Sequence, residues 1–286
     1  MSRVERPSWA PSDIDIERPS PARIYDYHLG GAHNFAVDRQ VAMQVAEIMP
    51  ELPLILRANR AFLRRAVTHL LAHGIRQFLD LGSGIPTVGN VHEIVEAAAP
   101  GSRVVYLDSD PVAVAHSRAL LAGDDNATAV RADLRDVDGV LAHPEVRRMI
   151  DFSRPVGVLL VAVLHFVPDA DDPAGIVARY RAAVRPGSQV VISHAAASED
   201  EQSPAGADEA TAVYSRSVTE TTLRTRAEVA AMFAGLDLVE PGVVYVNEWH
   251  PDPVAGKAAG ETAGETDAQR RLAQLVGVAT VPPTGS

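Results

Sequence analysis

Residues 76–89, RQFLDLGSGIPTVG, decide the fold that we expect for this chain. A short apolar strand pattern is followed at once by Gly82-Ser83-Gly84 and then by a helical pattern. This is how a first strand turns into a first helix in a nucleotide-binding α/β domain. Gly82 permits a tight reversal of the chain, and Gly84 lacks the Cβ atom that would keep a ligand away from the backbone. The turn is therefore predicted to bind a cofactor, with amide N–H groups facing it.

The residues around this turn narrow the choice of ligand. Thr87 stands where a dinucleotide fingerprint has its third glycine, and the Gly-Lys-Ser/Thr ending of a P-loop is absent. Asp80 precedes the first glycine and is placed to meet an ammonium group. Asp108 ends the next strand pattern, VVYLD, 24 residues after Gly84. Carboxylates near an amine and a ribose favour S-adenosylmethionine as the cofactor, with S-adenosylhomocysteine as its product.

Five segments of the chain together carry a family resemblance: ARIYDYHLGGAHNFAVDR, LDLGSGIPT, VVYLDSDP, ADLRD and AVLHFVPD. They resemble class I S-adenosylmethionine-dependent methyltransferases, and more narrowly an actinobacterial family of these proteins long catalogued as a domain of unknown function. The resemblance runs over residues 20–250. It implies a Rossmann-like, doubly wound α/β sheet of seven strands that binds S-adenosylmethionine. It implies no particular substrate.

Composition limits the classes of protein to which the chain can belong. Its 286 residues are 47% apolar, enough for a sizeable core, and the absence of cysteine excludes disulfides, thiolate metal sites and cysteine nucleophiles. The net charge of −11 opposes binding to nucleic acid. The first residues lack the apolar core of a signal peptide, and the longest apolar run, 156–164, is too short to span a bilayer. We therefore expect a cytoplasmic protein with no nucleic-acid or membrane partner.

Three parts follow from the pattern along the chain. Residues 1–22 are rich in proline and predict a flexible arm, with a lid as the alternative. Residues 23–74 predict a helical cap, and residues 75–286 the cofactor-binding α/β domain. Residues 195–221 interrupt the α/β alternation and predict a substrate lid, with plain disorder as the competing interpretation. Residues 272–281 are expected to return as an antiparallel last strand.

The remaining sequence predicts further strands and helices that alternate along the chain. Within the predicted lid, Tyr214 is the one large side chain available as an anchor. Thr225 and Glu228 have the spacing of a capping box at a helix start. Strands are expected at 103–108, 128–131, 156–164, 189–193 and 236–246, and helices at 87–98, 135–155, 173–184 and 225–235.

Residues after the second and third strands complete the predicted cofactor site. Asp110 precedes a proline and is expected to cap the following helix, which leaves Asp108, with its neighbour Ser109, to bind the ribose hydroxyls. The alternative is that Asp108 only caps the same turn. The resemblance implies that Asp133 accepts from the adenine amino group while Leu134 packs on the ring. Asp133 could instead be a solvated loop charge.

The segment YDYHLGGAHNFAVDR in the cap is unusual for an amphipathic helix. It gathers aromatic and polar side chains around a Gly30-Gly31 break. One interpretation is a turn whose polar groups cap neighbouring helices. The resemblance favours the other, that the segment helps to enclose cofactor or substrate, with Tyr25 and Asn34 near the ligand.

Two histidines are the candidates for a general base. His165 and His194 follow the strand patterns 156–164 and 189–193, and ligands bind at the carboxyl ends of such strands. An imidazole titrates near neutral pH and can accept a proton, although a structural hydrogen bond is the alternative for each. Metal binding is not expected, because a third ligand at suitable spacing is lacking. The Asn/Asp-Pro-Pro-Tyr/Phe box of many nucleic-acid and glutamine methyltransferases is absent after strand 156–164.

These observations predict methyl transfer from S-adenosylmethionine to a small-molecule acceptor, in secondary metabolism. Two other classes of function stay open: a cofactor-binding protein without turnover, and an enzyme that uses the sulfonium for cyclisation, elimination or hydrolysis. A nicotinamide oxidoreductase is a weaker alternative. The sequence leaves open the acceptor atom and whether the protein forms a homodimer.

Overall fold

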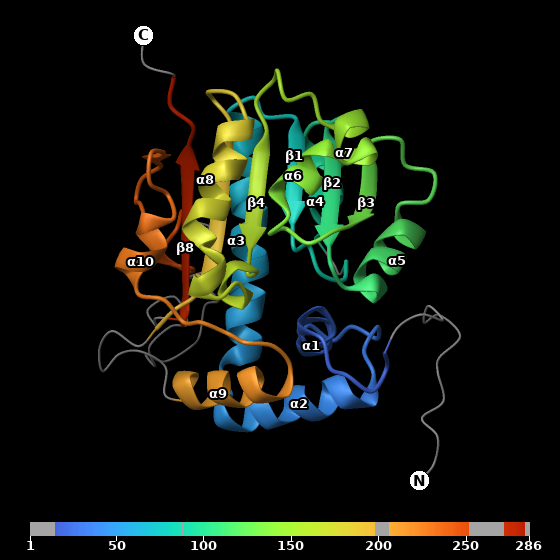
Figure 1. Ribbon diagram of the computed structural model, residues 1–286, viewed down its shortest axis with the longest axis vertical. Helices are drawn as coiled ribbons and strands as arrows, with labels where there is room; N and C mark the ends of the chain where they lie inside the picture. The colour runs from blue at the N-terminus through green and yellow to red at the C-terminus, as the bar shows by residue number, and fades with distance from the viewer. Residues whose placement is uncertain (1–14, 87–88, 198–205, 252–271, 284–286) are drawn as a thin grey trace, which may run out of the picture.

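A single mixed sheet forms the centre of the molecule (Figure 1). The computed structural model describes residues 15–86, 89–197, 206–251 and 272–283. Within them the strand order is β3-β2-β1-β4-β5-β8-β6, with β7 also pairing with β8. The strands are β1 (Gln77–Leu81), β2 (Arg103–Asp108), β3 (Ala127–Arg131), β4 (Gly157–Val161), β5 (Gln189–Ala195), β6 (Asp237–Leu238), β7 (Val244–Tyr245) and β8 (Gln274–Thr280).

The direction of the strands confirms the predicted doubly wound α/β fold. Strands β1 to β5 are parallel, and β8 lies antiparallel beside β5, as expected for the predicted last strand. In β1, Phe78 and Leu79 point to opposite faces and both are fully buried, because helices cover the sheet on both sides.

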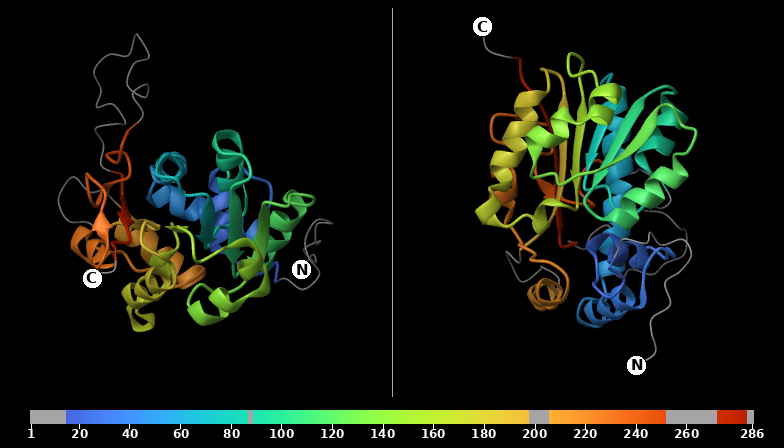
Figure 2. Two further views of the ribbon diagram at one scale, coloured as in Figure 1. Left: turned by 90° about the horizontal axis from the view of Figure 1, so that it is seen from above. Right: turned by 45° about the vertical axis from the view of Figure 1, so that its right-hand side comes forward.

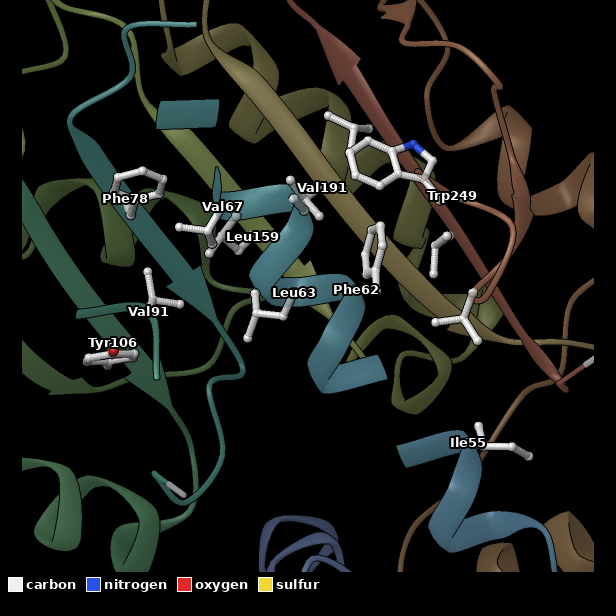
Figure 3. Packing of buried hydrophobic residues seen from close by; sticks show 14 of the residues in the cluster. Ile55, Phe62, Leu63, Val67, Phe78, Val91, Tyr106, Leu159, Val191 and Trp249 are labelled. Carbon is white, nitrogen blue, oxygen red and sulfur yellow. The ribbon is translucent and has the colours of Figure 1, made fainter. Parts of the chain in front are cut away.

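Helices pack on each face of the sheet. On one face Phe62, Leu63 and Val67 of α3 lie against the sheet, and the ring of Phe62 meets that of Trp249 edge to face (Figure 3). The opposite face is covered by α6, α7, α8 and α10. The helices are α1 (Pro21–His28), α2 (Ala36–Ile48), α3 (Leu52–Ala72), α4 (Val91–Ala98), α5 (Pro111–Leu120), α6 (Val137–Ala142), α7 (Pro144–Met149), α8 (Pro173–Ala183), α9 (Ala207–Ser217) and α10 (Arg226–Ala231), with short 3-10 turns η1 (Leu164–Phe166) and η2 (Asp169–Asp171). None of these helices in the described residues has both the length and the apolarity to cross a membrane.

Three helices lie across one end of the sheet. In Figure 1, α1, α2 and α9 sit below the carboxyl ends of the parallel strands, and the right-hand view of Figure 2 shows the same layer from another side. Helix α9 comes from the predicted lid segment and packs against α2, although the two are far apart in sequence. Doubly wound sheets bind ligands at this edge, and here the three helices cover it.

Several predicted boundaries were wrong for physical reasons. The strand expected at 156–164 stops at Val161, because Ala162 has a φ of +56° and turns the chain into η1. The strand expected at 189–193 instead continues through His194 to Ala195 because it pairs with β8. The helix expected at 135–155 is split into α6 and α7 at His143, since the residue before Pro144 is disfavoured in a helix.

Two further predicted elements also differ from the structure. The strand expected at 236–246 is two short strands, β6 and β7, separated by a turn in which Gly242 has a φ of +86°. Helix α4 begins at Val91 and not at Thr87, and Asn90 and Glu93 form a capping box at its start. Thr87 lies outside the described residues. The predictions for 1–14, 198–205 and 252–271 also fall outside them.

Candidate functional site

A cavity of about 670 Å³ lies between the sheet edge and the helices that cross it. Its volume falls in the roughly 300–1,000 Å³ range of small-molecule sites. Most of the predicted site residues line it: Tyr25, Asp80, Gly82, Ser83, Gly84, Asp108, Ser109, Asp133, Leu134 and His165. Asn34 and His194 are not among the residues that line it.

The two glycines of the turn after β1, Gly82 and Gly84, have different surroundings. Gly82 has a φ of +75°, and a Cβ there would lie 2.2 Å from a methyl group of Val163. Gly84 has a φ of +67°, and a Cβ on it would meet no described atom within 4 Å. The turn therefore leaves open space beside Gly84, as a ligand-binding turn should.

The amide groups of this turn do not face a ligand as expected. Gly82 and Ser83 donate their N–H groups to the carbonyl of Leu107, at 2.7 and 3.0 Å, and Gly84 donates to Oδ2 of Asp108 at 2.7 Å. These bonds join the first turn to the end of β2. The turn therefore leaves space for a ligand and holds the Asp108 side chain in place, but its amide N–H groups are already bonded to Leu107 and Asp108.

Two carboxyl groups near the carboxyl ends of β1 and β2 line the cavity, the buried Asp80 and the partly buried Asp108. Burial raises the pKa of Asp80 to about 7, with Arg60 lowering it and Asp108 raising it further. Burial also raises the pKa of Asp108 to about 6, against the amides of Asp110 and Gly84 that stabilise the carboxylate. Both groups are poised to become fully ionised when a cationic or hydroxyl-bearing ligand enters.

The loop after β3 supplies a more exposed part of the wall. Arg135 holds the carboxylate of Asp133 at 2.6 Å, and this hydrogen bond lowers the pKa of Asp133. Arg135 also reaches Asp171, 2.8 Å away. Leu134, next to them, is buried and presents an apolar surface to the cavity.

A buried polar chain that sequence reasoning missed connects α1, α3 and β5. Ser193 donates to Oδ1 of Asn59 at 2.7 Å, and Asn59 donates to the Tyr25 hydroxyl at 3.1 Å. That hydroxyl in turn donates to the carbonyl of Leu56 at 3.2 Å. Burial raises the pKa of Tyr25, so its phenol stays neutral.

A sequence signal for Asn59 did exist. The residue stands four positions after Ile55 and four before Leu63, on the helical stripe that faces the core. A polar residue on such a stripe needs buried partners. Arg60 beside it donates to the carbonyl of Gly89, 2.9 Å away, and so reaches the loop that leads from β1 to α4.

Asn34 has a structural position instead. Its side chain donates to Asp26 at 2.8 Å and to the carbonyl of Gly31 at 2.9 Å, and its oxygen accepts from Arg39 at 3.0 Å. A Cβ on Gly31 would lie 2.0 Å from the Asp26 carboxylate, so only glycine fits beside it. The polar groups of this segment therefore hold its own turn together, which was the alternative interpretation for Asn34.

An ion cluster joins α1 and α2, which we call the cap, to the loop after β2. Arg23 donates to Asp38 at 2.9 Å and lies 3.6 Å from a carboxylate oxygen of Asp110. Ser20 donates its amide to Asp38 at 2.9 Å and its hydroxyl to Asp110. Asp110 also caps α5 as predicted, accepting from Val112. We call Ser20, Arg23, Asp38 and Asp110 the cap latch.

His194 is fully buried inside β5 and is held on both sides. Its Nδ1 lies 2.8 Å from the carbonyl of Ala195, which can only accept, so Nε2 must accept from Arg224, also at 2.8 Å. Arg224 donates further to the carbonyl of Val167 and to Asp169. Burial lowers the pKa of His194 to about 4. This ring orients Arg224, which sequence reasoning missed.

His165 differs from His194 because it reaches the cavity. It lies in η1 with 8% of its surface exposed, and its buried Nδ1 has no hydrogen-bond partner among the described residues. Burial, together with His194 and Arg224 nearby, lowers the pKa of His165 well below its usual value. The ring is therefore neutral at physiological pH, and its buried Nδ1 is left without a partner among the described residues.

Comparison with known proteins identifies the family of the chain. Residues 7–282 match the model of a family described as S-adenosyl methyltransferase. A comparison with curated proteins gave no match. Two crystal structures are similar over nearly their whole length: a protein of Thermobifida fusca YX described as a methyltransferase (37% identity, TM-score 0.86, 96% of this chain and 100% of that one) and a DUF574 family protein of Streptomyces avermitilis (39% identity, TM-score 0.85, 94% and 99%). The chain therefore belongs to the S-adenosyl methyltransferase family, as its sequence resemblance implied, and its cofactor is S-adenosylmethionine.

Proposed function

We propose that this protein transfers the methyl group of S-adenosylmethionine to a small-molecule acceptor held in the same cavity. The observation that carries the proposal is the pair of carboxyl groups that line the cavity on either side of the open glycine turn, the buried Asp80 and the partly buried Asp108. Because β1 and β2 are adjacent parallel strands, these two carboxyl groups are placed to bind an amine and a neighbouring pair of hydroxyl groups. The cofactor's ammonium and ribose are the matching groups.

The described residues fit the cofactor in three further respects. Gly84 leaves space where a side chain would fill the cavity. Leu134 gives an apolar surface against which adenine can pack, beside the Asp133 carboxylate. Residues 15–25 close the cavity over Asp108 and Ser109 through the cap latch. We assign Asp80 to the ammonium group, Asp108 and Ser109 to the ribose, and Asp133 and Leu134 to adenine.

The chain's own contribution to the reaction is positioning and proton removal. When bound, S-adenosylmethionine supplies a methyl group already activated by a sulfonium. The protein has to align the acceptor and take up the proton that its hydroxyl or N–H group loses. We assign this proton to the imidazole of His165, which lines the cavity, whereas His194 does not line it and both of its nitrogens are occupied.

Calorimetric titration tests the cofactor assignment first. S-adenosylmethionine and S-adenosylhomocysteine are titrated into the wild type, Asp108→Ala and Asp138→Ala. Loss of hydrogen bonds to a charged group should weaken binding to Asp108→Ala by about 10- to 150-fold. The Asp138 side chain is 88% exposed, so this control should bind within about two-fold of the wild type. Equal affinity of all three proteins would refute the ribose assignment.

Product analysis then tests methyl transfer itself. Mass spectrometry with deuteromethyl-labelled cofactor should find the label in an acceptor, in step with release of S-adenosylhomocysteine. Release without a labelled product would point to elimination, cyclisation or hydrolysis, and binding without release to a protein that only holds the cofactor.

A further inference from the structure

The cavity has two parts with different chemistry. Below β1, β2 and β3 its wall carries the charged groups described above. Below β4, β5 and β8 the wall comes from α2, α9, the segment after α9 and η1; it includes Val45, Met49, Ala210, Tyr214, Val218 and Leu223. Among the described residues, no charged side chain from α2, α9 or 218–223 lines the cavity. We call this second part the apolar chamber.

A pair of parallel rings forms one wall of the apolar chamber. Phe166 of η1 and Tyr214 of α9 stack with their centroids 5.8 Å apart and their planes inclined by 19°. Both line the cavity, and burial raises the pKa of Tyr214, so its phenol stays neutral. Such a wall favours a flat occupant, because aromatic rings stack best on one another.

Two buried polar atoms of this chamber need a partner. The described residues leave Nδ1 of His165 and Nε2 of Gln274 without a hydrogen bond, although both residues are more than nine-tenths buried and both line the cavity. A buried polar group without a partner costs about 1–3 kcal/mol. Both atoms lie just beneath the cavity surface, so rotation of the His165 ring and of the Gln274 amide would bring them to a ligand. A ligand with a hydroxyl or N–H group would then satisfy Nδ1 of His165, and its oxygen would accept from Gln274.

The chamber disfavours a charged occupant of either sign. Arg60 reaches away from it to the loop before α4, and Arg224 is buried behind His165 with its donors already engaged. No carboxylate among the lining residues of the described chain belongs to this part. Moving an unpaired charge into such surroundings is costly.

We infer that the methyl acceptor is an uncharged, flat and mostly apolar molecule with one hydroxyl or N–H group that hydrogen-bonds to His165. It lies against Phe166 and Tyr214 in the apolar chamber, beside the cofactor. The inference rests on the proposed function, because it treats this chamber as the acceptor site.

Matched naphthalenes test the inference without knowledge of the natural acceptor. 2-Naphthol, 2-naphthoate, 2-naphthylmethylammonium and naphthalene share one flat ring system and differ in charge and hydrogen bonding. Each is titrated at pH 7.5 into protein saturated with S-adenosylhomocysteine. We expect 2-naphthol to bind at least about ten-fold more tightly than either ion. Equal or tighter binding of an ion, or no binding of 2-naphthol, overturns the inference.

Three variants separate specific binding from general loss of structure. Tyr214→Ala should weaken 2-naphthol and naphthalene alike, by roughly ten-fold. His165→Phe should remove the preference for 2-naphthol over naphthalene while naphthalene affinity is kept. Leu120→Ala, at a half-exposed surface position, should change neither. If His165→Phe keeps that preference, the role of Nδ1 is wrong.

The saturation step also separates this inference from the proposed function. Failure of S-adenosylhomocysteine to bind in the first titration contradicts the proposed function before any naphthalene is added. Normal cofactor binding followed by preference for an ion contradicts only the acceptor class.

Discussion

Asp80 shows how one residue can set both the pH response and the binding chemistry of the site. Its carboxyl group lies fully inside β1, only 6% exposed, and burial raises its pKa to about 7. In the unfolded chain the same group titrates near 3.8. The folded protein therefore binds more protons than the unfolded chain between these two pH values.

This difference predicts that the cofactor-free protein loses stability as pH rises. The contribution of Asp80 is fully present below about pH 4 and is lost as pH rises through about 7. Asp80→Asn cannot ionise, so it should be more stable than the wild type at pH 8, by on the order of 2–4 kcal/mol, with the gap closing towards pH 4. Urea unfolding of both proteins from pH 4 to 8.5 measures this. A constant gap would show that Asp80 does not titrate as described.

The site residues that the sequence could predict are those attached to short local patterns. Asp80, Gly82, Gly84 and Asp108 lie at or just after the carboxyl ends of strands, and these ends meet at one edge of a doubly wound sheet. Residues whose role depends on partners distant in the sequence could not be predicted. Asn59, for instance, meets Ser193 134 residues later in the chain.

Arg224 connects several elements below β4 and β5. It donates to the carbonyls of Leu164 and Val167, to His194 and to Asp169, and only 3% of it is exposed. These bonds hold η1, and with it His165, against the cavity. The sequence shows only an arginine just before a capping box, because its partners come from three other segments.

The two partners of the Arg224–Asp169 ion pair should differ in their effect on stability. Arg224→Met leaves two carbonyls and a histidine buried without a donor, so we expect a loss of about 2–4 kcal/mol. Asp169 is 79% exposed, and Asp169→Asn should cost less than about 1 kcal/mol. Urea unfolding at pH 7 measures both. A larger loss for Asp169→Asn would mean that the ion pair, and not the buried hydrogen bonds, stabilises η1.

At the scale of elements, the predicted order was right and the predicted ends were often wrong. The parallel strands, the last antiparallel strand and the capped helix after Thr225 were found where their local patterns placed them. The observed strand ends differ from the predicted ones where strand pairing or an unusual backbone conformation sets the end of the strand. β5 runs two residues further because β8 lies beside it, and β4 ends early at Ala162 with its positive φ.

For the whole molecule, the cap latch decides how firmly the cap closes the cavity. Arg23 and Asp38 are both buried, and burial raises the pKa of Asp38 despite the arginine. Removing one partner of a buried pair leaves the other charge uncompensated. The cap should then open more often than in the wild type.

Limited proteolysis at low protease concentration measures this opening. Arg23→Met should be cut within residues 15–72 faster than the wild type, by roughly ten-fold or more. The double variant Arg23→Met/Asp38→Asn should recover part of the resistance, because the uncompensated charge is gone. Arg148→Met, which breaks an exposed pair with Glu145, is the control. Equal cutting of Arg23→Met and Arg148→Met would contradict the role of the latch.

The position of β8 has a consequence for the synthesis of the protein. β8 fills the place beside β5, yet it follows β5 by roughly 80 residues in the chain. At about 5–20 residues per second, a ribosome needs about 4–16 s to make that stretch. Throughout this time the nascent chain presents an unpaired, apolar strand edge that includes Val190 and Ile192, the kind of edge that invites aggregation. We expect the yield of native protein in cells to depend on chaperones that shield this edge until β8 emerges.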